Sequence, residues 1–211
     1  MAAIVIRRLG NNVRVLEQNE SAIREDRGAG ITVGSAAQEF FKTYDLTRKP
    51  YYVVCPGFNF LDSESKVKRH LKRPMSNSTW NNLYYRLRAN FDAHRSEVCA
   101  NPPTLPKNQG DGVMQMGAKV TNITNGGEDV IVEYREASKG ILRSVRADLV
   151  IAADGASSTI REILLPDTKR TYSGYFAFRG IVSENDVSQE VRKLLGSKVN
   201  AYPYTGGYIL W

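Results

Sequence analysis

Cysteine and histidine are scarce in this sequence. Its 211 residues contain two cysteines, Cys55 and Cys99, and two histidines, His70 and His94. The cysteines are too far apart for a CxxC site and too few for a disulfide framework, which fits a reducing compartment. Neither histidine is spaced with cysteines or carboxylates as zinc ligands are. We therefore predict buried free thiols and no metal ion.

Long hydrophobic runs are also lacking. No stretch approaches the ~20 consecutive apolar residues that a membrane-spanning helix requires. The apolar residues 1–6 are followed by Arg7 and Arg8, whereas a signal peptide carries its positive charges before its apolar stretch. The composition, with 42% hydrophobic and 24% charged residues, is typical of a globular protein. We predict a cytoplasmic protein with no membrane partner.

Acidic residues are outnumbered, since 22 Asp and Glu accompany 29 Lys and Arg, and the net charge is +7. Part of the basic excess is local, in Lys66, Lys68, Arg69, Lys72 and Arg73. A basic nucleic-acid-binding protein is one alternative, which salt-sensitive retention on DNA would identify. No aromatic residues interleave with these charges, as they do on surfaces that bind single-stranded nucleic acid. We therefore expect a solvated basic face and no nucleic-acid partner.

The glycine fingerprint GxGxxG does not occur. Residues 2–9 predict a helix that ends at Gly10, and residues 13–17 predict a short buried strand that ends in Glu17. This order is typical of the second half of a dinucleotide-binding βαβ unit, in which the acid binds the adenosine ribose. The fingerprint would lie about 20 residues before Glu17, so we expect the sequence to begin inside the first helix. An ordinary exposed strand end explains Glu17 equally well.

The middle of the chain shows one clear helix. Residues 36–41 predict a short helix, and residues 49–73 are expected to be irregular, with a strand at 51–54. Residues 80–91 predict an amphipathic helix after a capping region at 76–79. Its apolar stripe is expected to pack in the core rather than to contact a cofactor; it consists of Trp80, Leu83, Tyr84, Leu87 and Phe91.

A run of strands follows. Residues 118–123, 130–134 and 141–145 predict an antiparallel meander, and residues 148–153 predict a buried strand that stops at the turn of Asp154 and Gly155. Ser157, Ser158 and Thr159 can then cap a helix, and Glu162, three residues after Thr159, completes a capping box with it. Such a turn presents a carboxylate and free backbone N–H groups at the sheet edge where α/β proteins bind ligands. A simple strand-to-helix turn is the alternative.

Three segments together resemble one enzyme family. RLGNNVRVLE (8–17), GAGI (28–31) and DLVIAADGASSTIR (148–161) are similar to the p-hydroxybenzoate hydroxylase family of FAD-dependent aromatic-ring monooxygenases. Two further segments, WNNLYYRLR (80–88) and YFAFRG (175–180), are similar to its 2,6-dihydroxypyridine hydroxylase branch.

The resemblance implies an α/β fold. It comprises part of a Rossmann-like FAD-binding domain, with a βαβ unit and an antiparallel meander, over residues 1–45 and 80–165. Residues 46–79 and 166–211 would form part of a β-sheet substrate domain.

The resemblance also implies which residues contact the cofactors. The motif DxxxxADGxxSxxR contacts FAD and the nicotinamide donor, which would assign these contacts to Asp154, Gly155 and Arg161. Glu17 becomes the ribose ligand. The loop of Gly28, Ala29 and Gly30 would lie beside the flavin through its backbone. Many relatives carry an arginine where Trp80 stands, and no side chain is identified as catalytic.

The implied activity is the hydroxylation of a small aromatic or pyridine-type ring with FAD, NAD(P)H and O2. Neither GxGxxG nor a later GD motif occurs, so we expect a fragment, truncated at both ends, that binds FAD weakly or not at all and is inactive as it stands. One alternative is a non-catalytic dinucleotide-binding or regulatory module. Another is a halogenase or epoxidase of similar fold.

Overall fold

The structure is a computed structural model that describes residues 1–23, 30–180, 182–195 and 198–210. The chain divides into two compact units. One comprises Ala2–Glu25 and Pro106–Ala177, and we call it the meander unit. The other comprises Met1, Asp26–Leu105 and Phe178–Trp211, and we call it the two-sheet unit.

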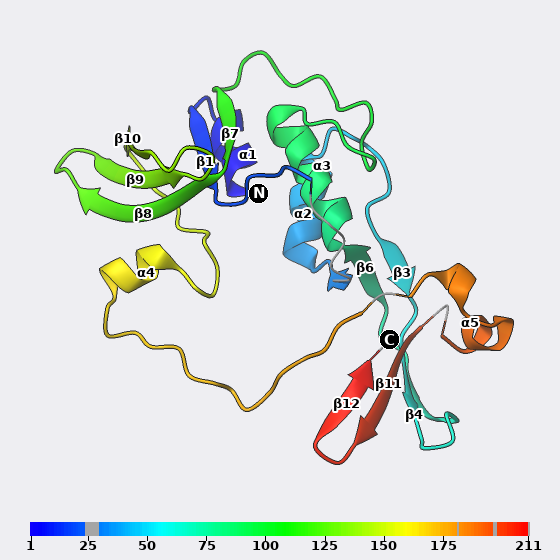
Figure 1. Cartoon of the computed structure of the whole chain (residues 1–211). Helices are drawn as coiled ribbons and strands as arrows, with labels where there is room; N and C mark the ends of the chain where they lie inside the picture. The colour runs from blue at the N-terminus through cyan, green and yellow to red at the C-terminus, as the bar shows by residue number, and fades with distance from the viewer. Residues whose placement is uncertain (24–29, 181, 196–197, 211) are drawn as a thin grey trace. The chain divides into compact units, whose positions relative to one another are not determined.

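The meander unit contains two helices and five strands among its described residues. In chain order these are α1 (Ala2–Arg8), β1 (Val13–Glu17), β7 (Gly112–Met116), β8 (Ala118–Asn125), β9 (Val130–Glu136), β10 (Leu142–Ala147) and α4 (Thr159–Leu164). Figure 1 shows β8, β9 and β10 side by side, in the green part of the chain.

The predicted helix and strand at the start of the chain are confirmed. α1 ends where Gly10 adopts a φ of +90°, a left-handed conformation that glycine takes without a steric penalty. β1 pairs in parallel with β7, from Val13 opposite Gly112 to Glu17 opposite Met116. β7 is a strand that was not predicted from the sequence. Its pairing places β1 in a parallel sheet, the arrangement that a βαβ unit requires.

The meander is also confirmed, in the order β10-β9-β8 with antiparallel pairing throughout. Val132 and Tyr134 of β9 are buried, and α4 packs against β8. The buried strand expected at residues 148–153 is wrong. These residues form neither strand nor helix, and Leu149 and Ile151 are 69% and 53% exposed. A strand needs a neighbour to satisfy its backbone groups, and no described strand pairs with this segment.

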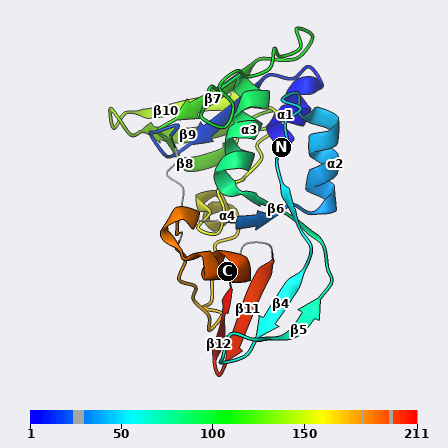
Figure 2. The same ribbon diagram turned by 90° about the vertical axis from the view of Figure 1, so that its right-hand side faces the viewer.

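The two-sheet unit contains the remaining elements. In chain order these are β2 (Gly30–Thr32), α2 (Ser35–Tyr44), β3 (Val53–Cys55), β4 (Phe58–Leu61), β5 (Val67–Leu71), β6 (Met75–Thr79), α3 (Trp80–Asp92), the 3-10 helix η1 (Glu184–Asp186), α5 (Gln189–Leu195), β11 (Val199–Tyr204) and β12 (Gly207–Leu210). The described strands form two sheets, β2-β6-β3 and β12-β11-β4-β5, and Figure 2 shows the second of these.

The expectation that residues 49–73 are irregular is wrong. They form β3, β4 and β5, and the predicted strand at 51–54 lies at Val53–Cys55. Gly57 permits the close approach of these strands, because a Cβ there would lie 2.2 Å from the backbone oxygen of Leu71. The segment escaped prediction because β5 is exposed at every position and carries no apolar face.

A chain of polar side chains crosses three strands of the larger sheet. Asn59 Nδ2 on β4 donates to Oδ1 of the fully buried Asn200 on β11, at 2.9 Å. Asn59 Oδ1 lies 2.9 Å from His70 Nδ1 on β5. Because Asn59 Oδ1 is an acceptor, His70 is the donor in this bond. These bonds link β5, β4 and β11 within one sheet, although Asn59 and Asn200 are 141 residues apart in the chain.

The predicted helix at 80–91 is confirmed as α3, but its apolar stripe describes the buried face only in part. Phe91 is 4% exposed, whereas Trp80 is 37% exposed. The buried positions also hold polar side chains, among them Arg86, Arg88 and Asn90. These polar groups are buried because the unit supplies hydrogen-bond partners for them, which periodicity in the sequence does not reveal.

Both cysteines are buried free thiols, as predicted. No helix in the described part of the chain is long and apolar enough to span a membrane. Among the same residues, no three His, Cys, Asp or Glu side chains gather as metal ligands would.

Candidate functional site

The turn before α4 is held together by its own side chains. Ser158 Oγ donates to Asp154 Oδ1 at 2.6 Å, and the backbone N–H of Ile160 donates to Asp154 Oδ2 at 3.2 Å. Ser158 Oγ also accepts from the backbone N–H of Arg161 at 2.9 Å, which makes Ser158 the N-cap of α4. Of the three residues predicted to cap this helix, Ser158 is confirmed, and the capping box of Thr159 with Glu162 is wrong. The cap lies one residue earlier because Ser158 is buried against Asp154.

These bonds set the charge of Asp154. Partial burial, the largest influence, would raise the pKa of this carboxyl. The hydroxyl of Ser158 and the backbone N–H groups of Ile160, Asp154 and Thr159 together outweigh it and hold the pKa below its ordinary value. Asp154 is therefore an anion at neutral pH.

The expectation of free backbone N–H groups at this turn is wrong for the first turn of α4. The N–H groups of Ile160 and Arg161 are already bound, to Asp154 and Ser158. α4 therefore does not offer its first turn to an anionic ligand. The groups that remain at the surface of the turn are the Asp154 carboxylate, the open backbone at Gly155 and the Arg161 guanidinium.

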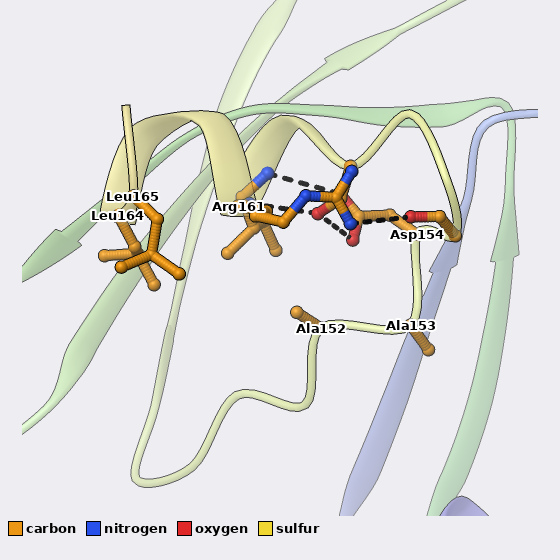
Figure 3. Close-up of a pocket in the computed structure, with 9 residues that line it drawn as sticks. Ala152, Ala153, Asp154, Arg161, Leu164 and Leu165 are labelled. Atoms are coloured by element: carbon orange, nitrogen blue, oxygen red, sulfur yellow. Dashed lines mark hydrogen bonds between the residues drawn. The ribbon is translucent and has the colours of Figure 1, made fainter. Parts of the chain in front are cut away.

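Arg161 folds back over the turn, as Figure 3 shows. Its guanidinium donates to the backbone oxygens of Gly155, at 3.4 Å, and Ala156. A guanidinium carries five N–H donors, so these two bonds leave donors for a ligand. Gly155 adopts a φ of +78°, and a Cβ there would meet no atom within 4 Å. A flat ligand could therefore approach the backbone at this position closely.

An open pocket of about 460 Å³ lies between this turn and α4. Its lining combines polar and apolar side chains: Ala152, Ala153, Asp154, Gly155, Ser158, Ile160, Arg161, Leu164 and Leu165. A mainly apolar wall with a few polar groups at one end is the usual character of a small-molecule site. The residues present thus fit contact with part of an elongated cofactor that has both apolar and polar regions, such as FAD.

The structure brings three of the seven predicted site residues together: Asp154, Gly155 and Arg161 line one pocket. Glu17 ends β1 in the same unit but does not line it, and its Oε1 accepts from the backbone and side-chain amides of Asn19. Gly30 begins β2 in the two-sheet unit, where it pairs with Thr79. Gly28 and Ala29 lie outside the described residues.

Sequence reasoning missed the apolar wall of the pocket. Ile160, Leu164 and Leu165 contribute to it. Their signal was present, because Ile160 and Leu164 are four residues apart and so share one face of a helix.

Known proteins with similar sequences and folds point to one class of enzyme. Residues 172–211 match the family described as FAD binding domain-like. A curated relative, the aurachin C monooxygenase/isomerase of Stigmatella aurantiaca, is 34% identical over 201 residues, which are 90% of this chain and 45% of that protein. The chain thus spans less than half the length of this relative.

A solved structure shares the fold over most of the chain. The 2,6-dihydroxypyridine-3-hydroxylase of Arthrobacter nicotinovorans matches with a TM-score of 0.69 and 18% identity, over 94% of this chain and 44% of that one. The chain resembles the FAD-dependent monooxygenases and has part of their fold.

A second solved structure agrees with the fold assignment. Klebsiella pneumoniae HpxO, solved with FAD and uric acid, matches with a TM-score of 0.55 and 16% identity, over 90% of this chain and 44% of that one. The expected α/β architecture, with parallel and antiparallel sheets, is confirmed. At these identities the likeness shows the fold alone, so the dihydroxypyridine hydroxylase branch stays a prediction.

Proposed function

We propose that this chain is part of a flavin-dependent monooxygenase that uses NAD(P)H and O2 to hydroxylate a small aromatic or pyridine-type ring. The observation that carries the proposal is the turn of Asp154, Gly155 and Arg161, which lines an open pocket within a fold shared with FAD-dependent monooxygenases. The relative from Stigmatella aurantiaca adds support through sequence, because its similarity extends over 90% of the chain.

Each group at the turn has a distinct part in the proposal. Gly155 lets the cofactor lie against the backbone, and Arg161 offers hydrogen-bond donors to its polar atoms. The apolar wall of Ile160, Leu164 and Leu165 keeps water from one side of the pocket. Asp154 acts mainly by holding the turn in shape, since both of its oxygens bind groups of α4. When bound, FAD supplies the electron transfer and the activation of oxygen.

Other assignments belong to the same proposal. Glu17, at the carboxyl end of a parallel strand, would bind the ribose of the cofactor. Gly28, Ala29 and Gly30 would lie beside the flavin. Residues 1–45 and 80–165 would form the FAD-binding domain, and residues 46–79 and 166–211 would form the substrate domain. Strands β4 and β11, which come from the two parts of the latter, pair in parallel and so support that grouping.

Titration of the chain with FAD, followed by backbone amide NMR, would test the proposed contact. We expect weak, saturable binding with the largest shifts at Gly155 and its neighbours, and we expect Gly155→Val to abolish those shifts. Arg146→Gln, at an exposed ion pair in the same unit, removes a positive charge away from the turn and should bind FAD like the parent. No shift near Gly155 at saturating FAD would overturn the assignment.

Oxidation of NADH and NADPH then tests the activity. We expect oxidation that phenolic or pyridine-type compounds stimulate, together with incorporation of oxygen into the ring, in a protein that carries bound FAD. Flavin bound at Gly155 without any such oxidation, in protein fully loaded with FAD, would favour the non-catalytic dinucleotide-binding module.

A further inference from the structure

The sheet β12-β11-β4-β5 of the two-sheet unit has two unlike faces. Side chains alternate between the faces along each strand and share a face with their cross-strand partners. Asn59, Leu61 and Asn200 lie at the centre of one face and are 7%, 3% and 0% exposed. The opposite face contains Phe58 and Phe60 of β4, Arg69 and Leu71 of β5, and Tyr208 and Leu210 of β12. We call it the Phe60 face.

Large apolar side chains on the Phe60 face meet solvent. Leu71, Leu210 and Tyr208 are 37%, 54% and 70% exposed, and Phe58 and Phe60 are only partly buried. Exposed apolar groups that stand singly on a surface are ordinary, whereas neighbours on one face of a sheet mark a contact surface. The Phe60 face therefore has the character of a surface that binds a partner.

Charge beside this face is of one sign. Residues 66–73 contain five Lys and Arg and no acid, and residues 199–211 contain no charged residue. Lys66 pairs with Glu64 at 2.6 Å. Within the described part of the chain, no acid pairs with the remaining four cations, which are exposed: Lys68, Arg69, Lys72 and Arg73. Because β5 is the edge strand of the sheet, these cations border the Phe60 face.

The turn between β4 and β5 holds these cations in place. Asp62 Oδ1 accepts from the backbone N–H groups of Glu64 and Lys66, at 3.0 and 2.9 Å. The Asp62 N–H in turn donates to the backbone oxygen of Lys66 at 3.0 Å. The Asp62 carboxylate thus binds the backbone of the turn and does not neutralise the cations of β5. The sheet presents apolar groups and uncompensated positive charge together.

The surface of an anionic bilayer satisfies both features. Its headgroup boundary accepts apolar and aromatic side chains, and its negative headgroups attract Lys and Arg. A second copy of the chain would bring cations against cations. A nucleic acid would leave the aliphatic side chains of Leu71 and Leu210 without a use, because its bases stack on aromatic rings and guanidinium groups.

We propose that the Phe60 face and the cations of residues 66–73 bind the surface of a bilayer that contains anionic lipids. The predicted lack of a membrane partner rested on the absence of a long apolar segment, and contact with a bilayer surface does not require one. The face shares no residue with the turn of Asp154, Gly155 and Arg161. The proposal therefore goes beyond the proposed flavin chemistry and does not depend on it.

Co-sedimentation with lipid vesicles at low ionic strength tests the contribution of charge. We expect at least tenfold tighter binding to vesicles of equal parts phosphatidylglycerol and phosphatidylcholine than to phosphatidylcholine alone, and added salt should weaken it. The double variant Lys68→Gln/Arg69→Gln should lose most of this preference. Arg14→Gln/Lys119→Gln removes two exposed cations from the meander unit and should bind like the parent. No preference for the anionic vesicles, or equal losses in the two variants, would overturn the proposal.

A second pair of variants tests the apolar contact. Leu210→Ser should weaken binding to the anionic vesicles several-fold. Leu142→Ser on β10 is the matched control and should bind like the parent, because Leu142 is also 54% exposed. Equal binding by Leu210→Ser and the parent would contradict contact through the Phe60 face.

A fluorescent label locates the contact. An environment-sensitive fluorophore on Tyr208→Cys should shift to the blue on the anionic vesicles, and brominated lipid should quench it. The same label on Leu142→Cys should show neither effect. Labelling is selective, since Cys55 and Cys99 are buried. An unchanged spectrum at Tyr208→Cys in vesicle-bound protein would overturn the proposed orientation.

Two other occupants would give different results. Retention on single-stranded DNA that depends on Lys68 and Arg69, without binding to anionic vesicles, would overturn the proposal in favour of a nucleic acid. Self-association that Leu210→Ser abolishes, measured by analytical ultracentrifugation in protein that does not bind vesicles, would overturn it in favour of a second copy.

Discussion

Each unit of the chain contains a carboxylate that closes a turn against a helix, but the two carboxylates lie in opposite environments. In the two-sheet unit, Asp45 follows α2 and pairs with Arg86 of α3 at 2.5 Å, with side chains only 6% and 3% exposed. In the meander unit, Asp154 precedes α4 and lies at the surface.

The partners of the two carboxylates differ accordingly. Arg86 also donates to Thr47 Oγ1 and to the backbone oxygens of Lys49 and Pro50, and Asn90 Nδ2 donates to Asp45 Oδ1. These bonds join α2, the following loop and α3, and they leave no room for a ligand. The Asp154 carboxylate, by contrast, binds Ser158 and Ile160 at the start of α4 and lines an open pocket. The comparison indicates that buried charge stabilises the two-sheet unit, whereas exposed charge in the meander unit remains available for binding.

The largest predicted effect is in the buried pair. Arg86→Met should lower the free energy of unfolding by about 3–5 kcal/mol, because it leaves the Asp45 carboxylate buried without its cation. Urea denaturation would measure the loss, and hydrogen exchange of the Leu46 amide, which donates to Asn90 Oδ1, would locate it. The control is Arg143→Gln, since Arg143 pairs with Glu136 at the surface. A loss no greater than in the control would show that the network is not structural.

The next effect concerns the cap of α4. Ser158→Ala should lower the free energy of unfolding by about 1 kcal/mol. The substitution removes both the N-cap bond to the Arg161 amide and the hydroxyl that donates to Asp154. Faster hydrogen exchange of the Arg161 amide would report it. Thr159→Ala is the matched control and should cost less, since Thr159 is not the cap. The opposite order would restore the capping box expected from the sequence.

A smaller effect depends on pH. The pKa of Asp154 lies below its ordinary value of 3.8 in the folded chain, so its carboxylate stabilises the fold at neutral pH. That contribution is lost as the pH falls below 3.8 and through the lowered pKa. Asp154→Asn should therefore melt below the parent at pH 7, and the difference should shrink in acid. Asp167→Asn, at an exposed turn, is the control. A difference that does not change with pH would contradict the assigned bonds.

The smallest effect belongs to a surface pair of the meander. Arg146 and Asp129 lie 3.0 Å apart, and the Arg146 side chain is 73% exposed. Arg146→Gln should change the free energy of unfolding by no more than ~0.5 kcal/mol, and added salt should remove the difference, because water and ions screen such pairs. Urea denaturation at two salt concentrations would measure it. A loss comparable to that of Arg86→Met would remove the contrast between buried and exposed charge.

Local patterns in the sequence predicted the elements whose formation is local. α1 was predicted with its Gly10 end, and the meander was predicted from three apolar strands separated by glycine turns. The turn of Asp154 and Gly155 was recognised from its spacing. The Asp154 carboxylate was expected to face a ligand, yet it binds Ser158 and Ile160. Which groups the carboxylate binds depends on the backbone conformation of residues 154–160, and residue types alone do not specify that conformation.

By itself, the sequence determined helices α1, α2, α3 and α4, the meander and the position of the candidate turn, because these follow from periodicity, glycine conformation and capping within a few residues. The tertiary structure alone decided the rest. β7 became a strand by pairing with β1, about a hundred residues earlier in the chain, and β5 became one by pairing with β4 despite its polar sequence. Residues 148–153 have a strand's composition but no described neighbour to pair with. Strands and buried charges both depend on partners that are distant in sequence, and these partners come together only when the chain folds.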